Sequence, residues 1–486
     1  MIEEKKNKNY MSWLTLAMLD YVTIIGFEDI FFPFQNQGLS VVISWLFLLA
    51  TYIIPYEMIV TQLGLTFKEN EAGGLASWIR RGTGSDALGY ATSWMYWAQT
   101  IPYLVDVSNS VIVAISWLIL GNNTLSQHMS TFTFGLLTFV IILLFLVFEN
   151  SYRKALDIMS LIGGIAMFSM SFIFVLLVAW ALTHGAHMAT PLTWSNLKPS
   201  FSLHYFSTTG LLIFAMSGAE LAAPYVSRLK HPVRDFPKSM WALVFMTAFM
   251  TIFQTLGLAA LFDTHNIPKD FKMNGSYYAF QILGREAGMG NTLMYVFAAV
   301  QLFFMLAQLA ALVDAASRVF ASDTASEYMP KWILKKNKSG RPVHSYMLTA
   351  GIALFLLLLS GTLPEINDIF NWLLNLNGIV SPYKTSVVFI AFLAIRYQQD
   401  KFKSDFVFIK NKKGALAVGW WCFLFTFACA TMGFLPQEAQ FGTQAWTNQL
   451  WMNIFSVLVL FGTGFLLPWL RKLEMKREAD EDVLSN

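Results

Sequence analysis

The stretch Thr23-Ile-Ile-Gly-Phe-Glu-Asp-Ile-Phe-Phe-Pro33 interrupts the first apolar run of the chain. It places Gly26, the adjacent acids Glu28 and Asp29, and Pro33 at mid-span depth, where ionisable side chains are costly. Glycine lowers helix propensity and proline removes a backbone donor, so we expect the helix to break here. Backbone groups freed in a membrane must face a cavity or protein, because lipid offers no hydrogen-bond partners. The stretch therefore predicts an unwound segment that can hold a ligand.

A second interruption lies in the sixth apolar run, Phe214-Ala-Met-Ser-Gly-Ala-Glu220. Here Ser217 and Gly218 precede an acid, Glu220. Transporters with inverted repeats form their substrate sites where two corresponding helices are broken. The first and sixth runs would be the opening helices of two five-helix halves. Ordinary helix kinks are the alternative explanation of each interruption.

The rest of the chain is typical of a membrane protein that crosses the bilayer many times. Its 486 residues are 56% hydrophobic and 13% charged, with a mean hydropathy of +0.51, which excludes a purely soluble or disordered protein. A helix needs about 20 apolar residues to cross the bilayer. Twelve runs of this kind fill most of the chain: 11–34, 40–66, 87–120, 131–149, 155–183, 206–229, 239–262, 291–321, 345–363, 367–396, 415–434 and 448–470.

The positions of the basic residues predict the orientation of these runs. Alternate loops and the two tails hold 28 of the 33 Lys and Arg residues. The other loops hold four, and Lys384 lies inside a run. Because Lys and Arg accumulate on the cytoplasmic side, both termini are predicted to be cytoplasmic, in a multi-pass protein of the cell membrane.

Several classes of function have no support in the sequence. It contains no glycine-rich phosphate loop and no paired His ligands, so we expect neither ATP hydrolysis, nor a cofactor, nor a metal site. Cys422 and Cys429 are the two cysteines, and they form no disulfide framework. A net charge of +3 does not favour nucleic acid as a partner. No nucleophile–base set suggests an enzyme. The expected partners are a small molecule and membrane lipid, and the oligomeric state stays open.

Short motifs along most of the chain resemble the amino acid–polyamine–organocation superfamily, in particular its glutamate/GABA antiporter-like branch. In order, the stretches that carry the resemblance are Ile25–Pro33, Glu71–Trp78, Ser93–Trp97, Ser217–Glu220, His231–Pro237, Ser317-Arg318 and Tyr328–Pro330. The resemblance implies an all-α fold of twelve transmembrane helices, with a five-plus-five inverted repeat and broken helices 1 and 6. It also implies alternating-access transport of amino acids or amines.

On this resemblance the chain is one transmembrane domain. The first repeat is expected at 11–183 and the second at 206–396, followed by helices 11 and 12 at 415–470. Residues 1–10 and 471–486 are the cytoplasmic tails.

Seven acids lie within the predicted spans against one base, Lys384. They are Asp20, Glu28, Asp29, Glu57, Asp106, Glu220 and Asp314. Relatives hold a substrate carboxylate at the break in helix 1, but acids at a half-helix N-terminus complement its dipole themselves and repel a carboxylate. An amine or guanidinium group fits this position better. Alternatively, one of the two acids caps the half-helix or pairs with Lys384.

The resemblance and the breaks together predict the substrate-binding residues. They are Gly26, Phe27, Glu28, Asp29, Gln99, Thr100, Tyr103, Phe214, Ser217, Gly218, Glu220, Leu312 and Asp314. Phe214 takes the place of an aromatic lid, and Leu312 replaces a second aromatic gate found in some relatives.

Several of these acids and Lys384 have alternative roles. Asp314 can instead pair with Arg318, and Glu220 can bridge helices. We expect Asp106 to join a polar network near Ser108 and Asn109. Asp20 and Glu57 are expected at an inner gate or in packing. Lys384 can neutralise an acid when the site is empty, or pair permanently with Asp106 or Glu57.

These residues predict a secondary transporter that exchanges an amino acid or cationic amine precursor for its amine product. Agmatine and putrescine are one such pair. An excess of unpaired acids would keep the empty carrier from switching until a cation neutralises them. A proton-coupled amino acid uptake permease is the alternative.

Overall fold

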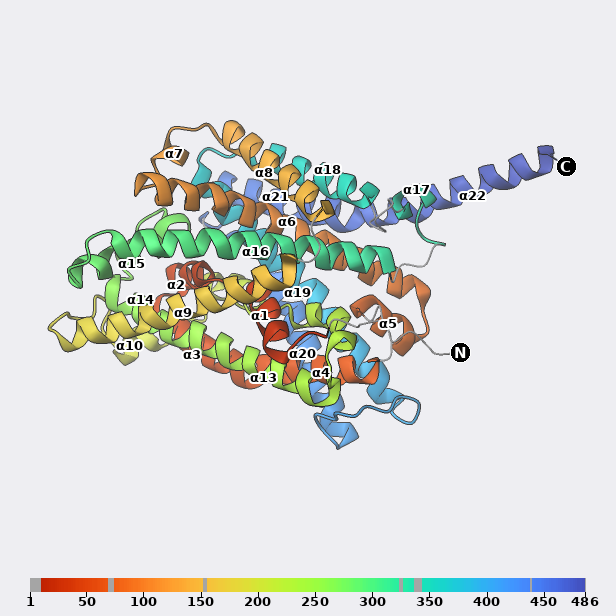
Figure 1. Cartoon of the computed structure of the whole chain (residues 1–486), viewed down its shortest axis with the longest axis horizontal. Coiled ribbons are helices and arrows are strands. Elements are labelled where there is room, and N and C mark those ends of the chain that lie inside the picture. The colour runs from red at the N-terminus through yellow and green to blue at the C-terminus, as the bar shows by residue number, and fades with distance from the viewer. Residues whose placement is uncertain are drawn as a thin grey trace.

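The structure is a computed structural model that describes residues 10–68, 74–151, 155–322, 327–335, 343–437 and 439–485. Throughout these ranges the secondary structure is helical, and the long helices lie side by side along the longest axis of the molecule (Figure 1). In this view α1 and α19 lie near the middle of the bundle, and both are largely buried.

The part of the chain before residue 184 forms the first group of helices. They are α1 (Trp13–Ile24), η1 (Phe27–Ile30), α2 (Phe31–Gln37), η2 (Gly38–Ser40), α3 (Val41–Leu48), η3 (Leu49–Ile53), α4 (Ile54–Thr66), α5 (Leu75–Thr83), α6 (Asp86–Leu120), α7 (Thr124–Gln127), α8 (Thr131–Ser151) and α9 (Ala155–Thr183).

A second group follows from residue 194 to residue 397. It contains α10 (Trp194–Leu197), α11 (Leu203–Ser207), α12 (Thr209–Phe214), η4 (Ala219–Arg228), α13 (Pro232–Phe249), η5 (Met250–Gln254), α14 (Thr255–Leu261), α15 (Phe271–Glu286), α16 (Thr292–Ser322), α17 (Lys331–Leu334), α18 (Val343–Ser360) and α19 (Ile366–Tyr397). The chain ends with α20 (Lys412–Met432), α21 (Gln444–Gly462), η6 (Thr463–Phe465) and α22 (Leu466–Ser485).

The prediction of an all-α polytopic membrane protein is confirmed. Nine helical stretches of the described chain are long and apolar enough to cross a membrane. Three shorter apolar helices add to them: Trp13–Ile24, Thr131–Val147 and Tyr346–Ser360. The count of twelve spans and the inverted repeat stay predictions.

Both predicted helix breaks are present. The first helix stops at Ile24, and Gly26 is extended before η1 begins. The sixth stops at Phe214 and resumes as η4, with Gly218 at a φ of 142°, a conformation that side-chain-bearing residues rarely adopt. A Cβ atom on Gly218 would lie 2.8 Å from Ile24, so the two breaks lie against each other.

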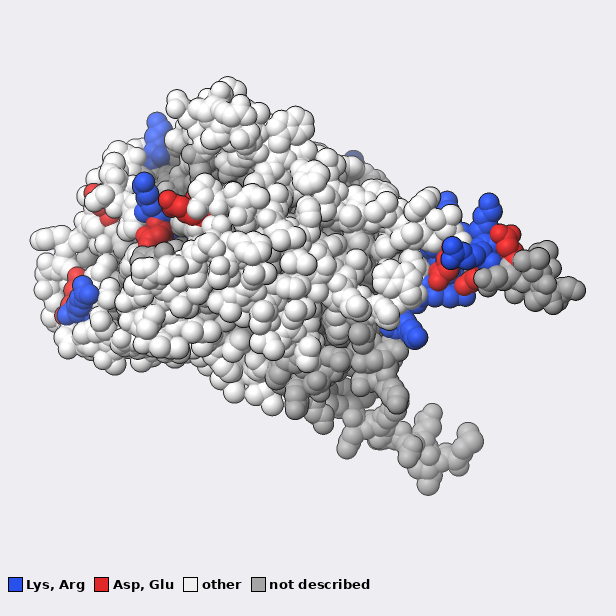
Figure 2. Space-filling view, turned by 90° about the horizontal axis from the view of Figure 1, so that it is seen from above, with Lys and Arg blue, Asp and Glu red and all other residues white. Residues whose placement is uncertain are grey.

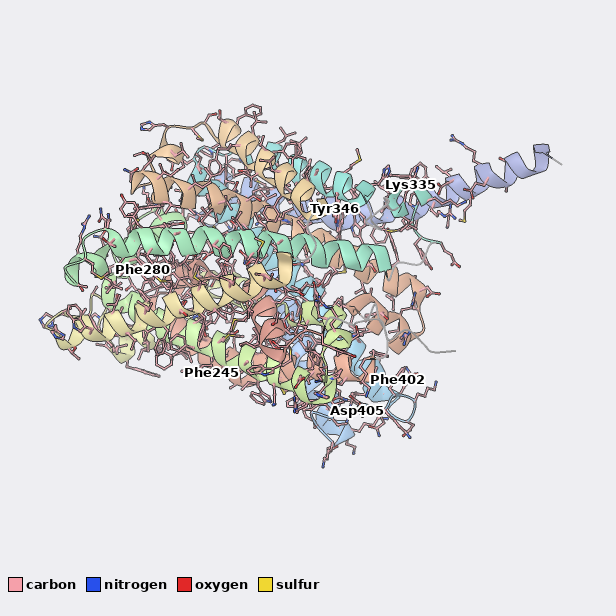
Figure 3. The ribbon with its side chains drawn as sticks, in the orientation of Figure 1. Phe245, Phe280, Lys335, Tyr346, Phe402 and Asp405 are labelled. Atoms are coloured by element: carbon pink, nitrogen blue, oxygen red, sulfur yellow. The ribbon has the colours of Figure 1, made fainter. Side chains whose placement is uncertain are left out.

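The ends of the bundle differ from its flank. The flank seen in Figure 2 is almost free of charged side chains, which gather toward the two ends of the molecule. Helices α5, α17 and α22 lie at one end, and α7, α10 and α15 at the other (Figure 1). In Figure 3, Lys335, Phe402 and Asp405 lie at the first end, and Phe280 lies in the opposite half. On the face shown, charged side chains thus lie toward the ends of the bundle and outside its apolar flank.

A close backbone contact holds the first half of the broken sixth helix in place. A Cβ atom added to Gly210 in α12 would lie 2.4 Å from the carbonyl oxygen of Gly378 in α19. We therefore expect Gly210→Ala to destabilise the fold by about 1–3 kcal/mol through overpacking, measured as a lower melting temperature in detergent. Gly351→Ala is the control, because a Cβ at Gly351 meets nothing within 4 Å. Equal melting temperatures for both variants would contradict the prediction.

Candidate functional site

Asp29 is the residue that caps the second half of helix 1. The backbone N–H of Gly26 donates a hydrogen bond to Asp29 Oδ2 at 2.6 Å, and the Asp29 side chain is buried. A carboxylate at this position satisfies a free backbone donor and complements the half-helix dipole. Asp29 therefore has the capping role that the sequence left open for one of the two adjacent acids.

Glu28 lies in a different environment. Its Oε2 accepts a hydrogen bond from Gln301 Nε2 at 2.6 Å, and its carboxylate folds back over the break. A Cβ atom on Gly26 would lie 2.7 Å from the same oxygen. Glu28 is partly exposed, whereas the residues on either side of it are buried. Of the two acids at the break, Glu28 is therefore the less buried.

Lys272 is a site residue that the sequence did not indicate. It lies in α15, and only 5% of its surface is exposed. Helix α15 packs against η1 and α2, so that a Cβ atom on Gly275 would lie 2.6 Å from the Phe31 ring. The positive charge of Lys272 acts on Glu28, Asp29 and Asp106. Only the packing of α15 over the break brings this cation to the acids.

Lys272 makes no hydrogen bond or ion pair with the described side chains. Its interaction with the three acids is therefore one of longer range. The Lys272 ammonium group is thus buried without a direct partner among the described side chains.

Asp106 lies in α6 on the same side of the site. It is buried, and its Oδ1 has no hydrogen-bond partner in the described part of the chain. The predicted network with its neighbours is not seen there, because Ser108 donates to Leu104 O at 2.7 Å and Thr138 donates to Asn109 at 2.6 Å. Asp106 thus belongs with the charges around Lys272.

Two predicted aromatic residues meet at the site. The rings of Tyr103 in α6 and Phe214 in α12 lie edge to face, with their centroids 5.0 Å apart. The Tyr103 hydroxyl accepts a hydrogen bond from Gln308. Of their neighbours in α6, Gln99 is buried, and Thr100 donates to Trp97 O at 2.7 Å. This aromatic contact connects α6 to α12, the half-helix before the second break.

Helix α16 contributes Gln301 and Gln308, which sequence reasoning missed. They are seven residues apart and so lie on one face of the helix, together with Leu312, which is buried. Two glutamines at this spacing in an otherwise apolar run are a signal that could have found them. The Asp314 side chain lies outside the part of the chain that the structure describes.

Phe27 points away from the charged groups. Its ring is fully buried among the rings of Phe31, Phe174, Phe280 and Phe297, with centroids 5.1–5.6 Å away. This aromatic cluster fixes the start of the second half-helix. The side chain of Phe27 is thus a packing element in this conformation.

The second break is closed by a buried network. The Gly218 N–H donates to the Tyr56 hydroxyl at 2.9 Å, and that hydroxyl donates to Glu220. Lys384 in α19 forms an ion pair with the other oxygen of Glu220, and both residues are 1% exposed. Glu220 therefore bridges helices, and the partner of Lys384 is none of the four acids named from the sequence, Glu28, Asp29, Asp106 and Glu57. Ser217 is buried beside it, and its hydroxyl has no partner among the described residues.

The Lys384–Glu220 ion pair should dominate the stability of this region. Lys384→Met leaves a carboxylate buried without its counter-charge, which costs about 3–5 kcal/mol, so we expect a clear fall in melting temperature. The double variant Lys384→Met with Glu220→Gln removes both charges and should recover most of the loss. A single variant as stable as wild type would show that the pair is unimportant.

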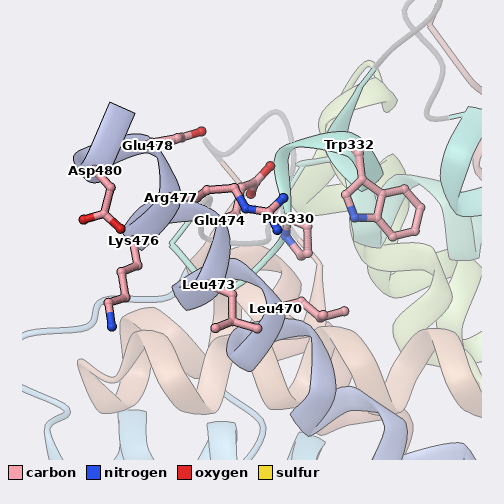
Figure 4. A pocket seen from close by; sticks show the side chains of 9 residues that line it. All are labelled: Pro330, Trp332, Leu470, Leu473, Glu474, Lys476, Arg477, Glu478 and Asp480. Atoms are coloured by element: carbon pink, nitrogen blue, oxygen red, sulfur yellow. The ribbon is translucent and has the colours of Figure 1, made fainter. Parts of the chain in front are cut away.

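A separate hollow lies at the end of the bundle, between α17 and α22 (Figure 4). Its side chains include Trp332, Leu473 and the charged residues of α22, among which Glu474 accepts a hydrogen bond from the Lys331 N–H at 3.0 Å. Lys331 also pairs with Glu478 at 2.6 Å. These contacts attach the C-terminal helix to the loop after α16. This hollow contains none of the predicted substrate residues.

Comparison with known proteins decides the family. The amino acid permease family profile matches residues 11–462. The chain belongs to this family. Its members are membrane transporters of the amino acid–polyamine–organocation superfamily, so the predicted resemblance is confirmed, and this permease is a transporter rather than an enzyme.

Individual relatives extend the comparison. The permease is 36% identical over 97% of both chains to the aspartate/glutamate permease AcaP of Lactococcus lactis subsp. cremoris. It is 24% identical over 78% of both chains to the probable agmatine/putrescine antiporter AguD of Lactococcus lactis subsp. lactis. The inner membrane transporter YjeM of Salmonella typhimurium is 24% identical over 51% of this chain and 50% of its own.

Proposed function

We propose that this permease carries amino acids across the membrane and that Glu28 binds the substrate ammonium group. The observation that carries the proposal is the pair of opposite charges at the first break. Glu28 is the less buried acid there, and Lys272 is a buried cation whose charge acts on it. An amino acid presents an ammonium and a carboxylate group, and each has an opposite charge to meet at this site.

The charge of Lys272 also indicates which other groups the substrate should carry. Lys272 offers a counter-charge to a substrate carboxylate, a group that a diamine lacks. The 36% identity to an aspartate/glutamate permease supports the same choice. Aspartate and glutamate are therefore the substrates to test first.

Exchange of a cationic precursor for its amine product is the second candidate. It is favoured by the charge balance, since six described acids in the spans face Lys272 and Lys384 alone. These acids are Asp20, Glu28, Asp29, Glu57, Asp106 and Glu220. The likeness to a probable agmatine/putrescine antiporter points in the same direction.

A thermal-shift titration separates the two candidates. Glutamate, alanine, agmatine and putrescine are added to purified wild type and to Glu28→Gln and Lys272→Met. We expect glutamate to stabilise wild type and the diamine not to. Each variant should bind glutamate about 10–100-fold more weakly, because a charged hydrogen bond contributes about 1.5–3 kcal/mol. Lys272→Met should retain alanine binding better than glutamate binding.

Two exposed residues near the site provide matched controls. Lys269→Met and Glu286→Gln make the same chemical changes at exposed positions and should bind glutamate like wild type. Stabilisation by agmatine or putrescine alone, lost in Glu28→Gln, would favour the exchanger instead. Unchanged glutamate affinity in both site variants would remove the proposed binding mode.

We also propose that the permease lies in the cell membrane with both termini in the cytoplasm. The support is the position of α5, α17 and α22, which contain or adjoin loops and tails rich in Lys and Arg, at one end of the bundle (Figure 1). A C-terminal tag should be cleaved by protease in inside-out vesicles and be protected in intact cells.

A further inference from the structure

A second group of charges lies apart from Glu28 and Lys272, on the other side of the two breaks. Asp20 in α1, Glu57 in α4, Glu220 in η4 and Lys384 in α19 are each 1% exposed. The charge of Asp20 acts on Glu57, and Glu220 acts on both. Three carboxyl groups thus share one ammonium group in a volume without solvent.

The Lys384 ammonium group forms its ion pair with Glu220. One of its oxygens pairs with Lys384, and the other accepts the hydrogen bond from Tyr56. Asp20 and Glu57 have no ion-pair partner among the described residues. Neither oxygen of Asp20 has a hydrogen-bond partner in the described ranges, and the same is true of Glu57 Oε2. A carboxylate ion with no donor and no counter-charge is strongly disfavoured at such depth, whereas the protonated acid carries no charge.

The neighbouring titratable groups do not supply a second cation. Tyr52, Tyr56 and Tyr96 are phenols on which these acids act. On the helices packed against α1, Arg228 pairs with Asp157 and Arg234 pairs with Asp235 at 3.0 Å. Lys238 lies near the start of α13 and is exposed. The side chains of Asp314 and Arg318 in α16 lie outside the described part of the chain.

We propose that Asp20 and Glu57 form a proton-binding site that couples transport to the proton gradient. This inference rests on the proposed amino acid transport and adds its energy source. In the closed conformation each acid holds a proton taken from the outer solution. When the end of the bundle with most basic residues opens, water reaches the acids, and both protons leave to the inner solution.

The location of the two acids explains how opening could release the protons. Asp20 lies on α1, whose start is held by the Met11 N–H bonded to Arg228 O at 2.8 Å and by Ser239 bonded to Trp13 O at 2.8 Å. Glu57 lies on α4, which packs against η4. Movement of α1 away from η4 and α13 would break these bonds, separate the two acids and hydrate both of them.

Transport in liposomes tests the coupling. Wild type, Asp20→Asn, Glu57→Gln and the exposed control Asp400→Asn are compared in two assays. The first is glutamate counterflow at equal pH, and the second is uptake driven by an acidic exterior. One pH unit can drive about tenfold accumulation per coupled proton. We expect both site variants to keep counterflow but to lose about tenfold or more of the driven accumulation, whereas Asp400→Asn keeps both.

A folding measurement tests the same site without any substrate. An acid that keeps its proton in the folded protein stabilises the fold at low pH, and this stabilisation is lost as the proton leaves at higher pH. The wild-type melting temperature should therefore fall as the pH rises above about 5, and fall less steeply in Asp20→Asn and Glu57→Gln. Asp400→Asn should follow wild type.

The outcomes separate the two proposals. Absence of glutamate counterflow in wild type removes the proposed substrate, while the melting curves still decide the proton site. Wild-type accumulation together with wild-type pH dependence of melting in both site variants overturns the proton site. Since an amide resembles the protonated acid, failure of both variants to fold at every pH would also contradict it.

Discussion

A helix interrupted in the middle of a membrane must bond its free backbone groups within the protein. Here the free N–H groups are bonded by a carboxylate at one break and by a tyrosine hydroxyl at the other. Asp29 accepts from the N–H of Gly26 at the first break, and Tyr56, held by Glu220, accepts from the N–H of Gly218 at the second. These side chains sit in the membrane because the unwound backbone needs them, and their charge then determines which groups can enter.

The charges of the site fall into two sets, on either side of the breaks. Around the first break, Glu28, Asp29 and Asp106 face Lys272 of α15. Around the second, Asp20, Glu57 and Glu220 face Lys384 of α19. In each set one cation faces three acids, so each needs further positive charge to become neutral. An ammonium group of the substrate can supply it to the first set and protons to the second, which would link binding and energy coupling through one electrostatic requirement.

The adjacent acids Glu28 and Asp29 have different surroundings. Asp29 turns inward to its own half-helix and is buried, whereas Glu28 folds over Gly26 and stays partly exposed. Consecutive residues on a helix point in different directions, so the two acids cannot share one role. The sequence-based hypothesis of an amine or guanidinium group at the break lacked Lys272, the buried cation on which the proposal of an amino acid substrate rests.

The sequence by itself determined the membrane class, the helical spans, both breaks and the acids near them. Hydropathy, glycine and charge are local properties that a linear pattern retains. Only the tertiary structure decided the partners: Glu220 for Lys384, Gln301 for Glu28, and α15 as the source of Lys272. These pairs join residues distant in the chain, and their formation depends on which faces of α15, α16 and α19 pack inward. In a region of low dielectric constant, that packing determines which charges are neutralised and which remain for a ligand or a proton.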